Sequence, residues 1–207
     1  MIMFDEKYFQ KVLREIKNDG LNQSKRLLDS LSPIQFESKS KLLEMVDEYI
    51  EKYSTVTVMG CWFMSIVGYV LSQKVKYVQG IDFDDRATRM GRRLFDGIDN
   101  VEFVNKDVFK MPTEKMILSN LIINTSCEHM PPMKEYPYWD RMSKDTYFAF
   151  QTHTNDNIND HTNCVTSLTQ FKEQIPDTWE ILKQDVLEDK DRGGHRYTLV
   201  GKIKWNV

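Results

Sequence analysis

The stretch from Val56 to Asp84 constrains the fold more than any other part of the chain. It begins with the apolar run Val56–Met59, turns at Gly60, continues through a helical segment and ends with a second apolar run that closes on Asp82. A buried strand, a glycine turn, a crossover helix and a second strand ending in a carboxylate form the first half of a nucleotide-binding βαβ unit. The sequence therefore predicts an α/β fold built on a parallel sheet.

The rest of the chain continues this alternation. Apolar and β-branched runs predict strands at residues 55–59, 77–82, 101–105, 120–124 and 146–151, with helices at 64–72, 84–95, 136–142 and 168–174. Two further strand-like runs, 179–187 and 195–204, flank a polar turn and predict an antiparallel hairpin. We expect a Rossmann-like, seven-stranded, mostly parallel sheet with helices on both faces and a C-terminal antiparallel hairpin.

The segment before the first strand is predicted to be helical. Apolar residues recur at helical spacing over residues 5–32 and again over 38–52, and Pro33 interrupts the pattern between them. Basic residues of the first segment, Arg26 among them, are expected on its solvated face. The predicted organisation is an N-terminal helical extension, residues 1–52, packed on a core domain of residues 53–207.

Charge and cysteine content limit the partners. The formal net charge of -3 argues against nucleic-acid or anionic-membrane binding, because such proteins normally carry a basic excess. One basic cluster on a predicted helix, interpreted mainly as a solvated face, keeps nucleic acid open as an alternative: Arg86, Arg89, Arg92 and Arg93. Three cysteines, no leader and no apolar run near the roughly 20 residues of a membrane span predict a cytoplasmic protein.

From residue 55 to 204 the order of elements resembles that of class I S-adenosylmethionine-dependent methyltransferases. The resemblance implies that Gly60, Cys61 and Trp62 approach the methionine part of S-adenosylmethionine and that Asp82 binds the ribose hydroxyls. It further implies that the adenine contacts Phe83, Asp107 and Val108, and that the transferable methyl group lies beside Asn124 and Thr125. Members of that family usually carry glycines where this chain has Trp62 and Met64, so its glycine motif is degenerate.

The two aspartates also have a physical reason to bind such a ligand. A ribose diol offers two donors that one carboxylate can accept, and an adenine needs an apolar surface with a polar contact at its edge. Asp82 and Asp107, at the ends of successive predicted strands, supply these groups. Either aspartate could instead be a helix N-cap.

Polar loops after the fourth and fifth predicted strands contain three of the four histidines. We interpret them as an acceptor site, in which Glu128 or His129 removes a proton while His153, His161 and Asn163 orient the acceptor. The loops also hold competent zinc ligands, namely Cys127, His129, His153, His161 and Cys164, but their spacing matches no standard zinc pattern and no metal centre is expected. A third interpretation is that these residues only cap helices and form turns.

The predicted function is methyl transfer from S-adenosylmethionine to a small-molecule acceptor. The chain is also similar to nicotianamine-synthase-like enzymes, in which a helical region precedes the same fold, and this implies aminocarboxypropyl transfer as one alternative. A non-catalytic cofactor-binding or partner-binding module and a nucleic-acid methyltransferase are the others. Residue spacing does not separate methyl from aminocarboxypropyl transfer, because both use the same sulfonium, and it indicates no oligomeric state.

Overall fold

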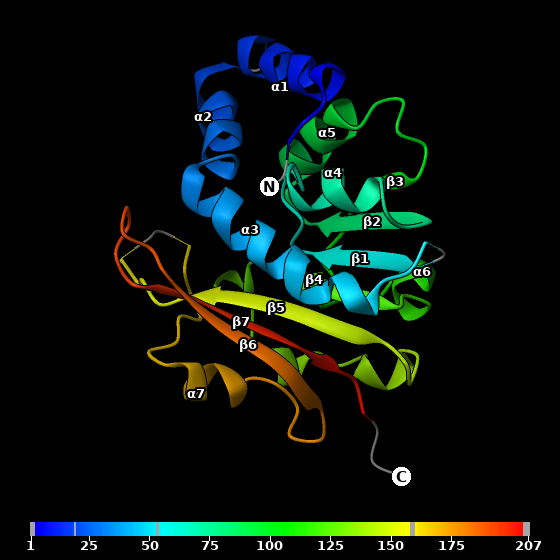
Figure 1. Cartoon of the computed structure of the whole chain (residues 1–207), viewed down its shortest axis with the longest axis vertical. Coiled ribbons are helices and arrows are strands. Elements are labelled where there is room, and N and C mark those ends of the chain that lie inside the picture. Colours follow the sequence, from blue (N-terminus) through cyan, green and yellow to red (C-terminus); the bar gives the residue numbers. More distant parts are fainter. Residues whose placement is uncertain (1–2, 19, 53, 158–159, 205–207) are drawn as a thin grey trace.

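A computed structural model describes residues 3–18, 20–52, 54–157 and 160–204. Its seven described strands form one sheet in the order β3-β2-β1-β4-β5-β7-β6 (Figure 1). The strands are β1 (Thr55–Met59), β2 (Tyr77–Asp82), β3 (Val101–Asn105), β4 (Leu121–Asn124), β5 (Tyr147–His153), β6 (Glu180–Glu188) and β7 (His195–Lys202). The predicted number of strands and their positions are confirmed to within two residues; the largest differences are at the ends of β5, at His153 instead of 151, and of β7, at Lys202 instead of 204.

The pairing of the strands confirms the predicted mixed sheet. β1 pairs in parallel with β2 and β4, β2 with β3, and β4 with β5. β7 inserts between β5 and β6 and runs antiparallel to both. From β1 the chain first adds β2 and β3 on one side and then β4 and β5 on the other. An open α/β sheet leaves a crevice for ligands at the point where the direction of strand addition changes.

Helices cover both faces of the sheet. Side chains from α1 to α5 form one apolar core with alternate residues of the strands, such as Val58 and Ile123. The opposite residues, such as Ile122 and Phe148, join a second core that includes Met116 of α6 and Phe171 of α7. The helices are α1 (Glu6–Asn18), α2 (Gly20–Ser30), α3 (Pro33–Val46), α4 (Val67–Ser72), α5 (Asp85–Leu94), α6 (Glu114–Ile117) and α7 (Leu168–Lys172).

The N-terminal helices pack on the core and reach the edge where β1 and β2 end. Tyr8 of α1 is buried, and its hydroxyl donates a hydrogen bond to the carbonyl oxygen of Ser65 at 2.8 Å. α3 crosses the sheet near β5 and β7 (Figure 1). It begins at Pro33 and not at Ser38 as predicted, because proline at the first helical position needs no N–H partner and so starts a helix here.

Two other predicted helices differ from the structure. The helix expected at 64–72 begins only at Val67, because the residues before it form a tight turn. The segment predicted as a helix at 136–142 contains the short 3₁₀ turn η4 (Trp139–Arg141), and another, η3 (Met133–Glu135), precedes it. Within the described residues, every helix is too short or too polar to cross a lipid bilayer.

Candidate functional site

A cavity of about 1090 Å³ opens where β1, β2 and β4 end. Its walls come from three parts of the chain. The loops after those strands contribute residues such as Gly60, Asp82 and Glu128, the helices α2 and α3 contribute Arg26 and Lys39, and the C-terminal hairpin contributes Arg192 and Arg196. The volume is at the upper end of the roughly 300–1,000 Å³ typical of ligand pockets, so it can hold more than one small molecule.

The turn after β1 holds three residues in the left-handed region of backbone conformation. The φ angles are 57° at Gly60, 49° at Trp62 and 52° at Met64. Glycine adopts this region freely, whereas a side chain makes it costly. Trp62 is held there by its N–H, which donates to Asp82 Oδ2 at 2.7 Å, and by its ring, which stacks on Phe63 at 4.7 Å between centroids. Thus the backbone at Trp62 and Met64 keeps the conformation that the expected glycines would favour.

Asp82, the last residue of β2, lines the cavity. Its Oδ2 accepts from Trp62, and its Oδ1 accepts from the N–H of Asp84 at 2.8 Å. Burial raises the pKa of Asp82 above its ordinary value, and the two backbone donors act against that rise. A carboxylate can accept about four hydrogen bonds, so capacity remains for a ligand. The next residue, Phe83, has 76% of its surface exposed and also lines the cavity.

Three of the predicted cofactor-binding residues do not line this cavity. Asp107 Oδ1 accepts from the N–H of Phe109 at 3.1 Å, and its Oδ2 lies 3.6 Å from Lys110 Nζ. Val108 is buried in the second apolar core. Asn124 is buried and its Oδ1 accepts from the N–H of Ser126 at 2.9 Å. By contrast, Gly60, Cys61, Trp62, Asp82, Phe83 and Thr125 are all brought together in the cavity wall.

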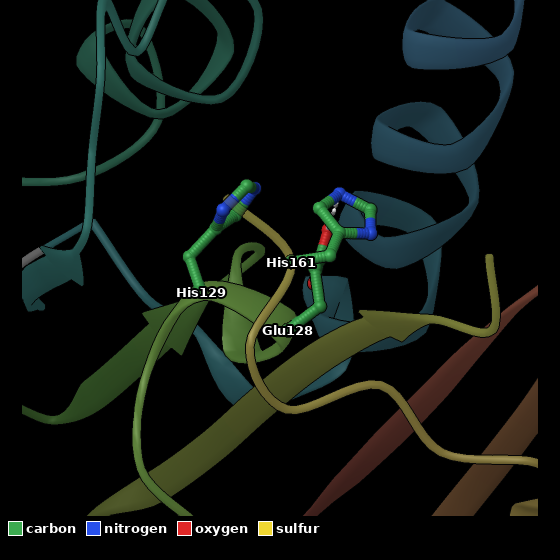
Figure 2. Close-up of side chains that lie close together, drawn as sticks. All are labelled: Glu128, His129 and His161. Carbon is green, nitrogen blue, oxygen red and sulfur yellow. Dashed lines mark ion pairs between the residues drawn. The ribbon is translucent and has the colours of Figure 1, made fainter. Parts of the chain in front are cut away.

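Glu128, His129 and His161 converge on one side of the cavity (Figure 2). Glu128 and His129 belong to the 3₁₀ turn η2 (Cys127–His129) after β4, and His161 follows β5. His161 Nε2 lies 4.0 Å from Glu128 Oε1, and each residue offers one ligand atom within 4.8 Å of the other two. The backbone N–H groups of Thr162 and Asn163 both donate to the Glu128 carbonyl oxygen at 2.9 Å, which ties the two loops together.

The remaining predicted catalytic residues support the loops and do not line the cavity. His153 is buried, with Nε2 3.2 Å from Asp189 Oδ2 and Nδ1 accepting from the Asn155 N–H at 2.9 Å. Burial lowers the pKa of His153 below its ordinary value. The Asn163 side chain exchanges two hydrogen bonds of 2.9 Å with the side chain of Gln174.

Sequence reasoning missed the contribution of the N-terminal helices and the hairpin. Arg26 was expected on a solvated face, but it pairs with Asp84 at 2.6 Å and lies 5.7 Å from the centre of the Trp62 ring. Lys39 is buried and donates to Gln151 Oε1 at 3.0 Å. The sequence did contain a signal for the burial of Lys39. It precedes the buried residues Leu42, Leu43 and Val46 by three, four and seven positions, which places it on the same face of α3.

The basic cluster on α5 is divided between the cavity and packing contacts. Arg86 and Arg89 line the cavity, and Arg89 pairs with Asp85 at 2.9 Å. Arg92 donates to the Phe103 carbonyl oxygen at 2.9 Å, while Arg93 Nε lies 2.6 Å from the buried Glu15 carboxylate. The prediction of a uniformly solvated arginine face is therefore only partly correct.

No protein-family model matches this sequence, and no curated protein sequence matches it. Solved structures match over most of the chain. The N-methyltransferase NodS from Bradyrhizobium japonicum WM9, in complex with S-adenosyl-L-homocysteine, is 14% identical with a TM-score of 0.66 and covers 95% of this chain and 98% of its own.

Two further structures agree with that match. A candidate methyltransferase from Bacillus halodurans C-125 is 10% identical with a TM-score of 0.65, over 82% of this chain and 100% of its own. A candidate S-adenosylmethionine-dependent methyltransferase from Listeria monocytogenes is 13% identical with a TM-score of 0.57, over 80% of this chain and 99% of its own. The chain therefore has the class I S-adenosylmethionine-dependent methyltransferase fold, as its element order predicted.

Proposed function

We propose that this protein binds S-adenosylmethionine in the cavity and transfers its methyl group to a small-molecule acceptor. The observation that carries the proposal is the Asp82 carboxylate, held at the end of β2 in the cavity wall by two backbone N–H groups. It retains acceptor capacity for a ribose diol, and the exposed ring of Phe83 beside it offers an apolar surface to an adenine.

The turn after β1 also suits this cofactor. A Cβ atom on Gly60 would lie 2.2 Å from Met130 Cε, so glycine lets the Met130 side chain, which also lines the cavity, pack against the turn. When bound, S-adenosylmethionine supplies an electrophilic methyl group on a sulfonium sulfur. The side chains of Glu128, His129 and His161 face the same cavity and would hold the acceptor, while His153 and Asn163 would fix the loops that carry them.

Two observations favour a small acceptor over a nucleic acid. The formal net charge is -3, and two of the four clustered arginines, Arg92 and Arg93, are engaged in contacts within the fold. The three cysteines, none of them in a disulfide, support the further proposal of a cytoplasmic location. Residues 1–52 would then be an extension that completes the cavity wall through Arg26 and Lys39.

Calorimetric titration with S-adenosylmethionine and S-adenosylhomocysteine tests the cofactor assignment. We expect saturable binding that Asp82→Asn weakens at least about 10-fold, since loss of a charged hydrogen-bond acceptor costs about 1.5–3 kcal/mol. Asp99→Asn is the matched control, because Asp99 is exposed in the loop between α5 and β3. Equal affinities in the wild type and Asp82→Asn would refute the assignment.

An acceptor screen then identifies the group transferred. Release of S-adenosylhomocysteine is expected for methyl transfer, whereas methylthioadenosine would indicate aminocarboxypropyl transfer. Cofactor binding without either product, across amine and hydroxyl acceptors, would favour the non-catalytic module.

A further inference from the structure

We propose that Glu128, His129 and His161 form a binding site for one divalent transition-metal ion of the Zn²⁺ class, in the wall of the cavity (Figure 2). Metal binding itself does not depend on the proposed methyl transfer. A role for the metal in methyl transfer does rest on the proposed function. In that role, an atom of the acceptor would bind the metal ion and so hold the acceptor in place.

The distances between the ligand atoms are close to those of a metal site. His161 Nε2 and Glu128 Oε1 are 4.0 Å apart, and all three ligand atoms lie within 4.8 Å of one another. Ligands at about 2.0–2.2 Å from a tetrahedral zinc lie about 3.4 Å from each other. The cluster therefore needs a contraction of about 0.6 Å between His161 and Glu128. The distances to His129 need a contraction of at most a little more than about 1 Å, which rotation of this exposed side chain can supply.

Both imidazoles are already oriented as metal ligands are. His129 Nδ1 lies 2.8 Å from the Asp160 carbonyl oxygen, and His161 Nδ1 lies 2.7 Å from the Asn155 carbonyl oxygen. A carbonyl oxygen only accepts, so in each ring Nδ1 carries the proton and Nε2 has a free lone pair. Donation of the second ring N–H to a backbone carbonyl is the usual outer contact of a metal-bound histidine.

Glu128 gives an independent reason to expect a cation. The residue is 97% buried, and among the described residues its Oε2 has no hydrogen-bond partner. A buried carboxylate without compensation is costly, because burial removes its hydration. Only 3% of the surface of Glu128 is exposed, which is too little for water to compensate the charge.

Nearby cations do not contact this oxygen. The charge of Arg196 interacts with those of Glu128 and Asp189, but its Nε lies 3.9 Å from Asp189 Oδ2 and forms no hydrogen bond among the described residues. Lys39 donates to the neutral Gln151 side chain, and burial holds its pKa well below the ordinary value, which weakens its positive charge. A metal ion between the two imidazoles would place a positive charge in direct contact with the Glu128 carboxylate.

The composition of the cluster selects the kind of metal. Two imidazole nitrogens and one carboxylate oxygen suit Zn²⁺ and its transition-metal neighbours, whereas Mg²⁺ and Ca²⁺ prefer sites made of oxygen alone. Three protein ligands leave at least one coordination position open. Because all three residues line the cavity, an oxygen or nitrogen atom of the acceptor can occupy that position.

The other candidate ligands of these loops do not join the cluster. Cys127 Sγ points to the Asn124 carbonyl oxygen at 3.8 Å, and Cys164 Sγ lies 3.4 Å from Nδ1 of His161, on the side of the ring away from its free nitrogen. His153 is paired with Asp189. The cluster therefore keeps only His129 and His161 of the five candidate zinc ligands named from the sequence and adds Glu128.

The test uses the whole 207-residue chain, treated with a chelator, dialysed and titrated with Zn²⁺ by calorimetry, with Co²⁺ absorption as a second readout. We expect one ion per chain and a visible Co²⁺ spectrum typical of nitrogen and oxygen ligands. His161→Ala and Glu128→Gln should each weaken Zn²⁺ binding by more than about 100-fold, because even outer-shell changes cost 10–100-fold. His129→Ala, at an exposed position, should do the same without a risk to folding.

His195→Ala is the matched control, since it removes a histidine that is exposed and outside the cluster. Unchanged Zn²⁺ affinity in His129→Ala, or loss of affinity in His195→Ala as large as in His129→Ala, would overturn the site. Failure of the metal proposal can be distinguished from failure of the cofactor proposal. Asp82→Asn should keep Zn²⁺ affinity, and His129→Ala should keep S-adenosylhomocysteine affinity.

Discussion

Trp62 and Met64 hold left-handed backbone conformations that cost a residue with a side chain about 1–2 kcal/mol each. The cost is offset by contacts. The Trp62 N–H donates to Asp82, and the Met64 N–H donates to the Cys61 carbonyl oxygen at 2.7 Å while its side chain is buried. Backbone strain of this kind is concentrated at functional sites in proteins. Its position beside Asp82 is consistent with the ligand site proposed there.

At Gly60 the same backbone conformation coincides with a close contact. We expect Gly60→Ala to lower the free energy of unfolding by about 1–2 kcal/mol because φ is positive, and to weaken S-adenosylhomocysteine binding because Met130, which lines the cavity, must shift. Gly97→Ala is the control: φ is 74° and a Cβ would meet nothing within 4 Å. Denaturant unfolding and calorimetry should show similar destabilisation in both variants and an affinity loss in Gly60→Ala alone. An affinity loss in Gly97→Ala would count against this explanation.

Lys39 gives stability a dependence on pH. Burial lowers its pKa in the folded state well below the ordinary value, so the unfolded chain binds this proton more tightly. The free energy of unfolding should therefore rise with pH between the folded-state pKa and the unfolded-state value of about 10.4. Unfolding experiments between about pH 7 and pH 10 should show a smaller slope in Lys39→Met than in the wild type. Equal slopes would mean that Lys39 keeps its proton when folded.

At the scale of elements, α1 contacts the site only through other residues. Tyr8 donates to the Ser65 carbonyl oxygen, and Ser65 lines the cavity between the left-handed turn and α4. α2 acts more directly, since Arg26 pairs with Asp84, the N-cap residue of α5. The helical extension thus fixes both loops, after β1 and after β2, that the cofactor is proposed to contact.

Tyr8→Phe tests how strongly α1 is held. The change leaves the buried Ser65 carbonyl without its donor, so we expect the free energy of unfolding to fall by about 1–3 kcal/mol. Tyr138→Phe removes a similar bond, to the Lys110 carbonyl oxygen, near the surface where water can replace it, and should change stability by less than about 0.5 kcal/mol. Denaturant unfolding of both variants gives the comparison. Equal changes in the free energy of unfolding would show that burial of the Tyr8 hydrogen bond adds nothing to stability.

For the whole molecule, the cavity joins segments from both ends of the chain. Asp29 of α2 pairs with Arg192 of the hairpin, and both residues line the cavity, as does Asp82. A ligand bound between these segments contacts only the folded state. Binding should therefore stabilise the entire fold, by an amount that rises with the logarithm of ligand concentration above the dissociation constant.

S-adenosylhomocysteine at about 100 times its dissociation constant should raise the free energy of unfolding by about 2.7 kcal/mol. Denaturant unfolding with and without the ligand measures the shift. At the same ligand concentration the shift should shrink in Asp82→Asn and remain in Asp99→Asn. A wild-type protein that shows no shift, although calorimetry detects binding, would mean that the ligand also binds the unfolded chain.

The sequence by itself determined the strand number, the parallel sheet with its antiparallel hairpin and the acidic end of β2. These features depend on local properties: a period of two or a short apolar run for a strand, a period of 3.6 for a helix, and glycine or polar residues at turns. The resemblance that followed from their order is confirmed at the level of the fold. Pro33 misled because a proline can begin a helix as well as end one.

Only the tertiary structure decided which polar side chains meet. Glu128 and His161 are far apart in the chain, as are Arg26 and Asp84, and no periodicity relates the members of either pair. Their distances depend on how loops and helices pack against the sheet, which balances many weak contacts over the whole molecule. For the same reason Asp107, which like Asp82 was expected to bind a ligand at the end of a strand, lies outside the cavity wall, whereas Lys39 lines the cavity.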